Sequence, residues 1–140
     1  MNPMKSSVVA AALAMFMLAS GASSQDAARG VYDALIAKHA AANGVPESLV
    51  RRVIARESEG NPRLVSNGNY GLMQIRLGTA RSMGYSGPAA GLLDPDTNLT
   101  YAVKYLAGAY RAAGGDAERA LHLYQRGYRD ESIPPGGKPK

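Results

Sequence analysis

Residues 46–62 read PESLVRRVIARESEGNP, and the rest of the chain can be interpreted from this stretch. Placed on a helix over residues 46–58, at 100° per residue, its apolar side chains form one stripe. The members of that stripe are Leu49, Val50, Val53 and Ile54. Glu57 falls near the middle of the stripe, so the pattern predicts a carboxyl group on the buried face of the helix.

The predicted position of Glu57 also favours its protonated form. Pro46 suits a helix start and Gly60-Asn61-Pro62 ends the helix, which puts Glu57 in the last turn. There the negative end of the helix dipole and the apolar neighbours both oppose ionisation, and a raised pKa is what a general acid needs. A rotated helix phase would instead make Glu57 a surface glutamate, and the pattern alone leaves both interpretations open.

The motifs that follow resemble a known enzyme family. The runs are ARESEGNP over residues 55–62, VS at 65–66, YGLMQI over 70–75 and TA at 79–80. They resemble the catalytic core of the soluble lytic transglycosylases, which have a lysozyme-like fold and carry E-S, G-L-M-Q, N and Y-N-x-G motifs in this order. Asn98, Tyr105-Leu106 and Tyr124-Gln125-Arg126-Gly127 match the later motifs, so the resemblance covers residues 31–128.

The resemblance implies roles for individual residues. Glu57 would be the catalytic acid and base, Ser58 would support the acid or the substrate, and Met73 would line a sugar subsite. Gln74 would hydrogen-bond the substrate, and Tyr124 would approach Glu57 across the groove. From pattern alone, Met73 is a core residue and Ser58 bonds local backbone.

The helix predicted over residues 94–113 adds polar candidates for sugar binding. Asn98, Tyr101 and Tyr105 share one side of it, and amide and aromatic groups suit saccharides because sugars have apolar faces and many hydroxyls. Of these we assign Asn98 and Tyr101 to substrate binding. The structural alternative is that Asn98 hydrogen-bonds a loop backbone and that the tyrosines pack between helices. For Tyr105 this alternative is at least as well supported as sugar binding.

The chain departs from the family pattern at three places. Leu77-Gly78 stands where the family commonly has a proline, which affects a turn more than the chemistry. Ala102 stands where glycine is common. Gln125 replaces the usual asparagine of Y-N-x-G, which puts in doubt the local backbone contact that asparagine makes.

Composition limits the function classes. The length of 140 residues suits one domain, and without cysteine neither a disulfide nor a thiolate metal site can form. His39 and His122 are not clustered with other ligands, so no metal and no cofactor are predicted. The net charge of +5 either attracts an anionic polymer such as the cell wall or only gives solubility. Arginine supplies most of the charge near the motifs, at Arg51, Arg52, Arg56, Arg63, Arg76 and Arg81.

The predicted fold class is all-α, a compact lysozyme-like domain. Helices are expected over residues 25–43, 46–58, 77–83 and 94–113, and from 116 onward, with residues 85–93 as a connection. A small β-hairpin within residues 63–70 stays possible. His39 is expected as a hydrogen-bonded histidine at the core boundary, and Asp94, Asp96 and Asp116 as helix caps.

The chain ends suggest export and an unstructured tail. Residues 1–24 combine Lys5, an apolar run and small residues, which predicts a signal peptide. The expected location is the periplasm, with secretion as the alternative, and no stable membrane anchor is expected after cleavage. Residues 25–129 are the expected transglycosylase domain. Residues 130–140 are polar and rich in proline and glycine, which predicts disorder. Nucleic acid is not an expected partner of an exported chain.

A single carboxylate governs the expected mechanism, because Glu57 alone combines an apolar helical face with neighbouring motif residues. The resemblance implies cleavage between N-acetylmuramic acid and N-acetylglucosamine of peptidoglycan, with a 1,6-anhydro product and no cofactor. Two alternatives stay open: a lysozyme-type hydrolase, and a noncatalytic wall-binding accessory of a secretion system. A partnership with an envelope-spanning secretion or flagellar apparatus is a further hypothesis.

Overall fold

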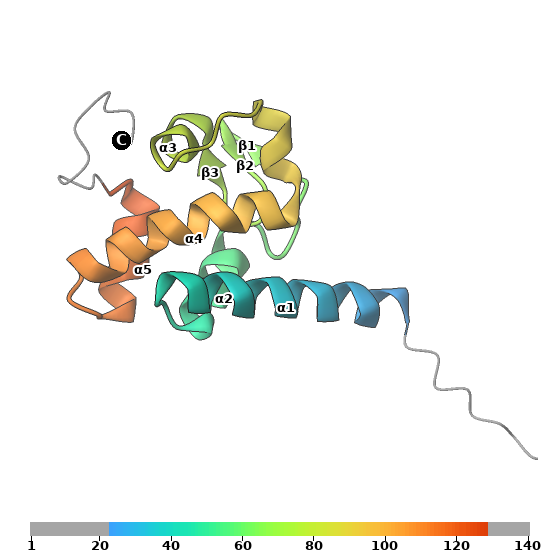
Figure 1. The fold of residues 1–140 in the computed structure, drawn as a ribbon, viewed down its shortest axis with the longest axis horizontal. Helices are drawn as coiled ribbons and strands as arrows, with labels where there is room; N and C mark the ends of the chain where they lie inside the picture. The colour runs from blue at the N-terminus through green and yellow to red at the C-terminus, as the bar shows by residue number, and fades with distance from the viewer. Residues whose placement is uncertain (1–22, 129–140) are drawn as a thin grey trace, which may run out of the picture.

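In the computed structural model, which describes residues 23–128, the long helix α4 lies between two groups of elements (Figure 1). On one side α4 contacts α1, which also packs on α2, and on the other it contacts α3 and the 3-10 helix η1. Helix α5 packs on α4 and α2. The elements are α1 (Ser24–Asn43), α2 (Glu47–Glu57), β1 (Val65–Ser66), β2 (Asn69–Tyr70), β3 (Ile75–Arg76), α3 (Leu77–Ser82), η1 (Ala89–Leu93), α4 (Pro95–Ala112) and α5 (Ala117–Arg126).

The predicted helices are confirmed, and several of their ends carry the signals that the sequence indicated. Gly44 ends α1 in the left-handed conformation with φ 65°. Asp94 caps α4 by accepting from the Thr97 amide, and Asp116 caps α5 in the same way. Pro46 precedes α2 as its N-cap instead of occupying the first turn. The mainly helical fold class is therefore confirmed.

Asp96 is not a helix cap, which corrects the prediction for this residue. Its carboxylate lies 2.6 Å from Nε2 of His39 and 3.3 Å from Nζ of Lys38, so it joins the first turn of α4 to α1. The hydrogen bond from His39 lowers the pKa of Asp96. His39 is buried and hydrogen-bonded, as expected of a histidine at the core boundary. Asp94, two residues earlier, already occupies the cap position.

The possible hairpin exists and is extended by a third strand. Strands β1, β2 and β3 form an antiparallel sheet in that order, with Ser66 opposite Asn69 and Asn69 opposite Arg76. The turn between β1 and β2 consists of Asn67 and Gly68, with φ 50° and 76°, the conformation that two-residue hairpin turns favour. The third strand and η1 were not predicted, since two-residue strands carry no alternating pattern.

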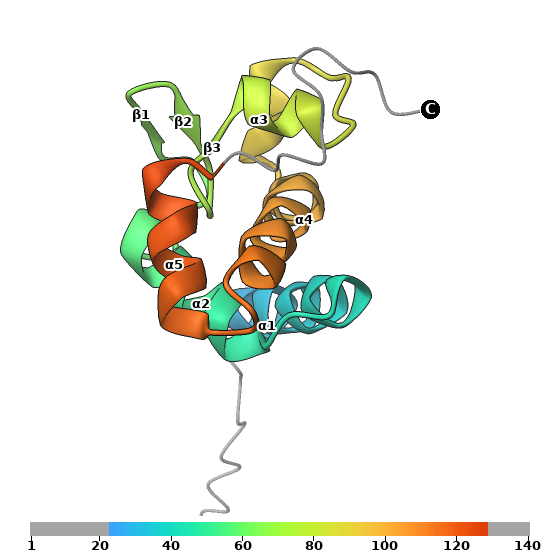
Figure 2. The same ribbon diagram turned by 90° about the vertical axis from the view of Figure 1, so that its left-hand side faces the viewer.

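The core contains the apolar stripe of α2 and the inner face of α4. Leu49, Val50 and Val53 are each at most 1% exposed, and Ile54 is buried as well. Glu57 follows this stripe and is half-buried at the end of α2. The same view turned by 90° shows α2 and α5 on one side of the molecule, with the sheet beyond the end of α5 (Figure 2).

Several predictions concern residues outside the described range. Of the predicted signal peptide, only Ser23 and Ser24 are described, and α1 begins at Ser24 after a capping box formed by Ser23 and Asp26. The predicted tail, residues 130–140, lies outside the described residues. Between residues 23 and 128, no helix is both long enough and apolar enough to span a bilayer. The domain limits and the tail stay predictions.

Candidate active site

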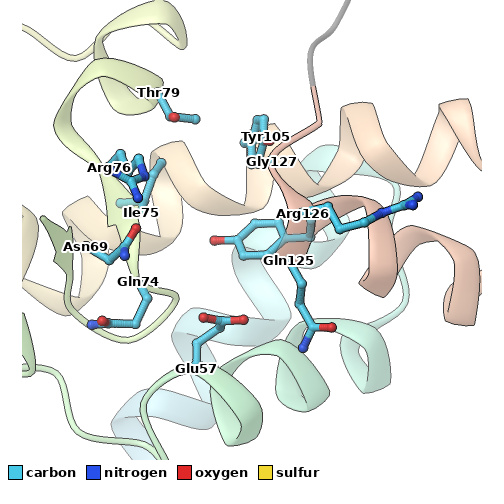
Figure 3. Close-up of a pocket in the computed structure, with 11 residues that line it drawn as sticks. Glu57, Asn69, Gln74, Ile75, Arg76, Thr79, Tyr105, Gln125, Arg126 and Gly127 are labelled. Atoms are coloured by element: carbon cyan, nitrogen blue, oxygen red, sulfur yellow. The ribbon is translucent and has the colours of Figure 1, made fainter. Parts of the chain in front are cut away.

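A cavity opens beside Glu57, between the small sheet and the C-terminal end of α5 (Figure 3). Its walls come from six elements, α2, β2, β3, α3, α4 and α5, together with Gln74 and Gly127 beside them. The lining residues are Glu57, Asn69, Gln74, Ile75, Arg76, Thr79, Tyr105, Tyr124, Gln125, Arg126 and Gly127. The lining is mainly polar, and in Figure 3 the carboxyl group of Glu57 points into the space between Gln74 and Gln125.

Glu57 has the properties of a proton donor. Burial raises its pKa above the ordinary glutamate value of 4.5. Its position at the C-terminal end of α2 acts in the same direction, because the helix dipole is negative there. Within residues 23–128 its carboxyl group has neither a hydrogen bond nor an ion pair, so its proton is not committed to a structural contact.

Most other acidic residues of the described chain are already engaged. Asp94 and Asp116 cap α4 and α5, and Asp26 accepts from Ser23 in the capping box of α1. The remaining ion-paired acids are Asp33, Glu47, Asp96 and Glu118. Glu59 is exposed, has a backbone φ of 52° and lies outside the cavity lining. Glu57 is thus the one acidic group among the described residues that line this cavity.

Three of the predicted substrate-binding residues hold the backbone of one turn, residues 71–74. Ser58 donates its hydroxyl proton to the Leu72 carbonyl at 2.7 Å. Tyr124 donates to the Met73 carbonyl at 2.7 Å, and Asn98 Oδ1 accepts from the Met73 amide at 3.0 Å. These side chains come from α4, α5 and the residue that follows α2, so the turn is fixed from three sides.

Gln74 is fixed by the same turn but keeps one polar atom available. Its amide nitrogen donates to the carbonyls of Leu64 and Gly71, both at 2.9 Å. Carbonyl oxygens only accept, so this assignment places the side-chain oxygen of Gln74 away from them. That oxygen accepts no hydrogen bond from residues 23–128. Every fully buried polar side-chain atom in this range does have a hydrogen-bond partner, so the Gln74 oxygen must be accessible to solvent. Gln74 has φ 51°, a strained value for a residue other than glycine.

The structure brings together some of the predicted site residues and separates others. Glu57, Gln74 and Tyr124 line the cavity. Ser58 and Asn98 are buried behind it, at 5% and 0% exposure. Met73 is 0% exposed and belongs to the hydrophobic core. Tyr101 lies outside the lining and packs against Tyr85, with ring centroids 5.1 Å apart.

Other cavity residues were not among the predicted substrate contacts. Tyr105 lines the cavity and packs its ring against Tyr124 at 5.3 Å, while its hydroxyl donates to the Tyr128 carbonyl at 2.6 Å. The interpretation that Tyr105 packs between helices is therefore confirmed, and a substrate contact of Tyr105 stays a prediction. Asn69 and Arg76 face each other across β2 and β3, a register that no sequence signal indicated. The remaining unpredicted lining residues are Ile75, Thr79, Gln125, Arg126 and Gly127.

Of the two tyrosines that line the cavity, Tyr124 has the more strongly raised pKa. Burial raises its pKa well above 10, and the charges of Glu57 and Tyr105 raise it further. The phenol therefore stays protonated and keeps donating to the Met73 carbonyl. Tyr124→Phe should lower the free energy of unfolding by about 1–2 kcal/mol, because a buried carbonyl loses its partner. Denaturant unfolding monitored by circular dichroism measures this.

Tyr101→Phe is the matched control for that substitution. Its hydroxyl has no hydrogen bond within residues 23–128, and the ring is retained, so its unfolding free energy should change by less than about 0.5 kcal/mol. Equal losses in the two variants would contradict the role assigned to the bond between Tyr124 and Met73.

The comparisons with known proteins point to one family. Residues 34–132 match the family model described as the transglycosylase SLT domain. The chain is 37% identical over 100 residues to the peptidoglycan transglycosylase gp16 of Escherichia phage T7, which covers 69% of this chain and 8% of the phage protein. It is 33% identical over 104 residues to the soluble lytic murein transglycosylase of Escherichia coli K12, covering 69% of this chain and 16% of that protein.

A solved structure agrees in both fold and sequence. The complex of the 70-kDa soluble lytic transglycosylase with bulgecin A superposes with a TM-score of 0.64 at 33% identity, over 69% of this chain and 17% of the other. The chain thus spans less than a fifth of these relatives. The match to the family model includes every element from α2 to α5. The chain belongs to the transglycosylase SLT domain family.

Proposed function

We propose that this domain is a peptidoglycan lytic transglycosylase that uses Glu57 as its single acid and base. The observation that carries the proposal is the half-buried, unpaired carboxyl group of Glu57, with a raised pKa, in a polar cavity. The family assignment supports the reaction class. The names of the relatives, a peptidoglycan and a murein transglycosylase, support the substrate.

The first step of the proposed reaction needs a proton. Glu57 would donate it to the glycosidic oxygen between N-acetylmuramic acid and N-acetylglucosamine while the bond from that oxygen to C1 of the muramic acid breaks. The acetamido group of the muramic acid would help to stabilise the developing positive charge at C1. Burial supports this step, because it keeps part of the Glu57 population protonated at higher pH than an exposed glutamate.

The second step uses the same group in its ionised form. Glu57 would take the proton of the C6 hydroxyl, whose oxygen attacks C1 and closes a 1,6-anhydro ring. The proton lost in the first step is thereby regained, and the reaction consumes no water. A glycosidase that follows the two-carboxylate scheme needs a second acid, and the described lining offers Glu57 alone.

The other polar groups of the cavity have roles in substrate binding under this proposal. The free oxygen of Gln74 would accept a hydrogen bond from a sugar hydroxyl or acetamido N–H. Tyr124 would form part of the wall and, with Ser58 and Asn98, would hold the turn that positions Gln74. Met73 would contribute through packing, and Tyr101 through its ring pair on α4.

The product decides between this proposal and its alternatives. Purified peptidoglycan is digested with the domain, and the released muropeptides are identified by mass spectrometry. Anhydro ends are expected. Reducing ends would indicate a lysozyme-type hydrolase, and wall binding without release would indicate a noncatalytic accessory protein.

The cellular setting follows from the proposed substrate. We propose export by residues 1–24 and action on the wall in the periplasm, where the glycan strands are accessible. Association with a secretion or flagellar apparatus stays a hypothesis, and pull-down of the exported protein from envelope fractions tests it.

A further inference from the structure

Two arginines stand in the walls of the cavity around Glu57. Arg76 ends β3, opposite Asn69 of β2, and Arg126 is the last residue of α5. Both side chains are exposed. In Figure 3 Arg76 lies on the sheet side of the cavity, whereas the Arg126 side chain extends outward from the α5 side, away from the Glu57 carboxyl group. A polymer crossing the cavity over Glu57 would therefore meet one cation on each side.

These two cations are not neutralised by the described part of the protein. Within residues 23–128 neither Arg76 nor Arg126 forms an ion pair, whereas Arg51 and Arg52 each contact carboxylates. Burial is the cause of the raised pKa of Glu57, and no arginine charge opposes it. The guanidinium groups are thus placed to bind an anion without favouring the ionised form of the acid.

The proposed substrate carries anions at regular positions. Each N-acetylmuramic acid has a lactyl group that ends either in a free carboxylate or in a peptide with carboxylates of its own. A guanidinium group presents a planar fork of N–H donors that matches a carboxylate. N-acetylglucosamine has no such group, so charge separates muramyl strands from neutral glycans.

We propose that Arg76 and Arg126 bind carboxylates carried by the muramyl residues on either side of Glu57, and so select anionic strands over neutral ones. This inference rests on the proposed function for its substrate class. It adds two specificity residues, one of them within the Tyr124-Gln125-Arg126-Gly127 segment where the chain departs from the family motif. An ion pair between exposed groups contributes only a modest binding free energy, and salt screens it.

Binding in a Glu57→Gln background tests the inference, because the strands are not consumed there. Fluorescently labelled oligomers of three kinds are titrated at low ionic strength: peptide-bearing muramyl strands, peptide-free muramyl strands and neutral chitin oligomers. We expect Arg76→Gln and Arg126→Gln each to weaken binding of anionic strands by about 2–5-fold, and the double variant by roughly tenfold. The loss should shrink at 0.5 M salt, where the Debye length is only about 4 Å.

Arg111→Gln is the matched control. Arg111 is also exposed and without an ion pair within residues 23–128, but it lies outside the cavity lining, so its loss should leave binding within about twofold. An effect confined to peptide-bearing strands would assign the arginines to peptide carboxylates, and one confined to peptide-free strands to the lactyl carboxylate. Both support the inference.

Two results would overturn it: an equal loss of binding to neutral chitin oligomers, or unchanged binding of anionic strands in the double variant. The proposed function is judged separately, by whether the unmutated domain releases anhydro products. Charge-selective binding without cleavage would therefore refute the proposed function and leave the selectivity standing.

Discussion

Glu57→Gln is expected to lower the rate of peptidoglycan cleavage by at least about 10³-fold, because one group supplies both proton transfers and each is worth roughly 10²–10⁴. Glutamine keeps the shape of the side chain but neither donates a carboxyl proton nor accepts one. The described lining contains no second acid that could take over. Release of soluble muropeptides, followed over time at equal protein concentration, measures the loss.

Glu59→Gln is the control for this substitution. Glu59 is two residues further along, is exposed and lies outside the cavity lining, so its replacement should leave the rate within about twofold. A Glu57→Gln variant with more than a tenth of the original rate would show that another group supplies the proton.

The pH dependence of stability gives an independent check on Glu57. Its folded-state pKa is raised above 4.5, so the folded protein binds this proton more tightly than the unfolded chain does. The stability from this group is therefore complete below pH 4.5 and is lost as the pH rises through the folded-state pKa. At neutral pH, Glu57→Gln should accordingly be at least as stable as the original protein, which separates its lost activity from unfolding.

The sequence predicts the position of Glu57 because the signals involved are local. The stripe of α2 and the turn residues that follow place the acid at the end of a helix and on its inner side, and the structure has it there. Gly44, Asp94 and Asp116 end or begin helices for equally local reasons. Asp96 was misassigned because its partner His39 is distant in the sequence.

The contacts of Asn98, Ser58 and Tyr124 could not be derived from local pattern. All three residues are polar, and a polar residue in a motif fits a sugar contact as well as a backbone contact. Only the packing of α4 and α5 against the turn at residues 71–74 shows that their polar atoms reach backbone groups. Arg76 and Arg126 reach the cavity through strand register and helix packing, which periodicity does not encode.

The turn itself gives the second large prediction. Gly71 has φ 72°, and a Cβ atom there would lie 2.5 Å from Asn98 Nδ2 and 2.5 Å from the Leu92 carbonyl oxygen. Gly71→Ala would thus add left-handed strain of about 1–2 kcal/mol to overpacking of about 1–3 kcal/mol. It should also displace Asn98 from the carbonyls of Tyr70 and Leu92, both now at 2.8 Å. We expect unfolding free energy to fall by roughly 3–5 kcal/mol, measured by denaturant titration.

Gly68→Ala separates the two causes, because the backbone strain is the same and the crowding is absent. Gly68 has φ 76°, yet its added Cβ would meet nothing closer than Arg76 Nη1 at 3.9 Å. The unfolding free energy of this variant should fall only by the cost of the left-handed backbone strain, about 1–2 kcal/mol. If both alanine variants lost the same amount, the tight contact of Gly71 with Asn98 and Leu92 would not matter to stability. A larger loss for Gly71→Ala would show that the close approach of Asn98 in α4 and Leu92 in η1 is what requires glycine at the first position of the turn.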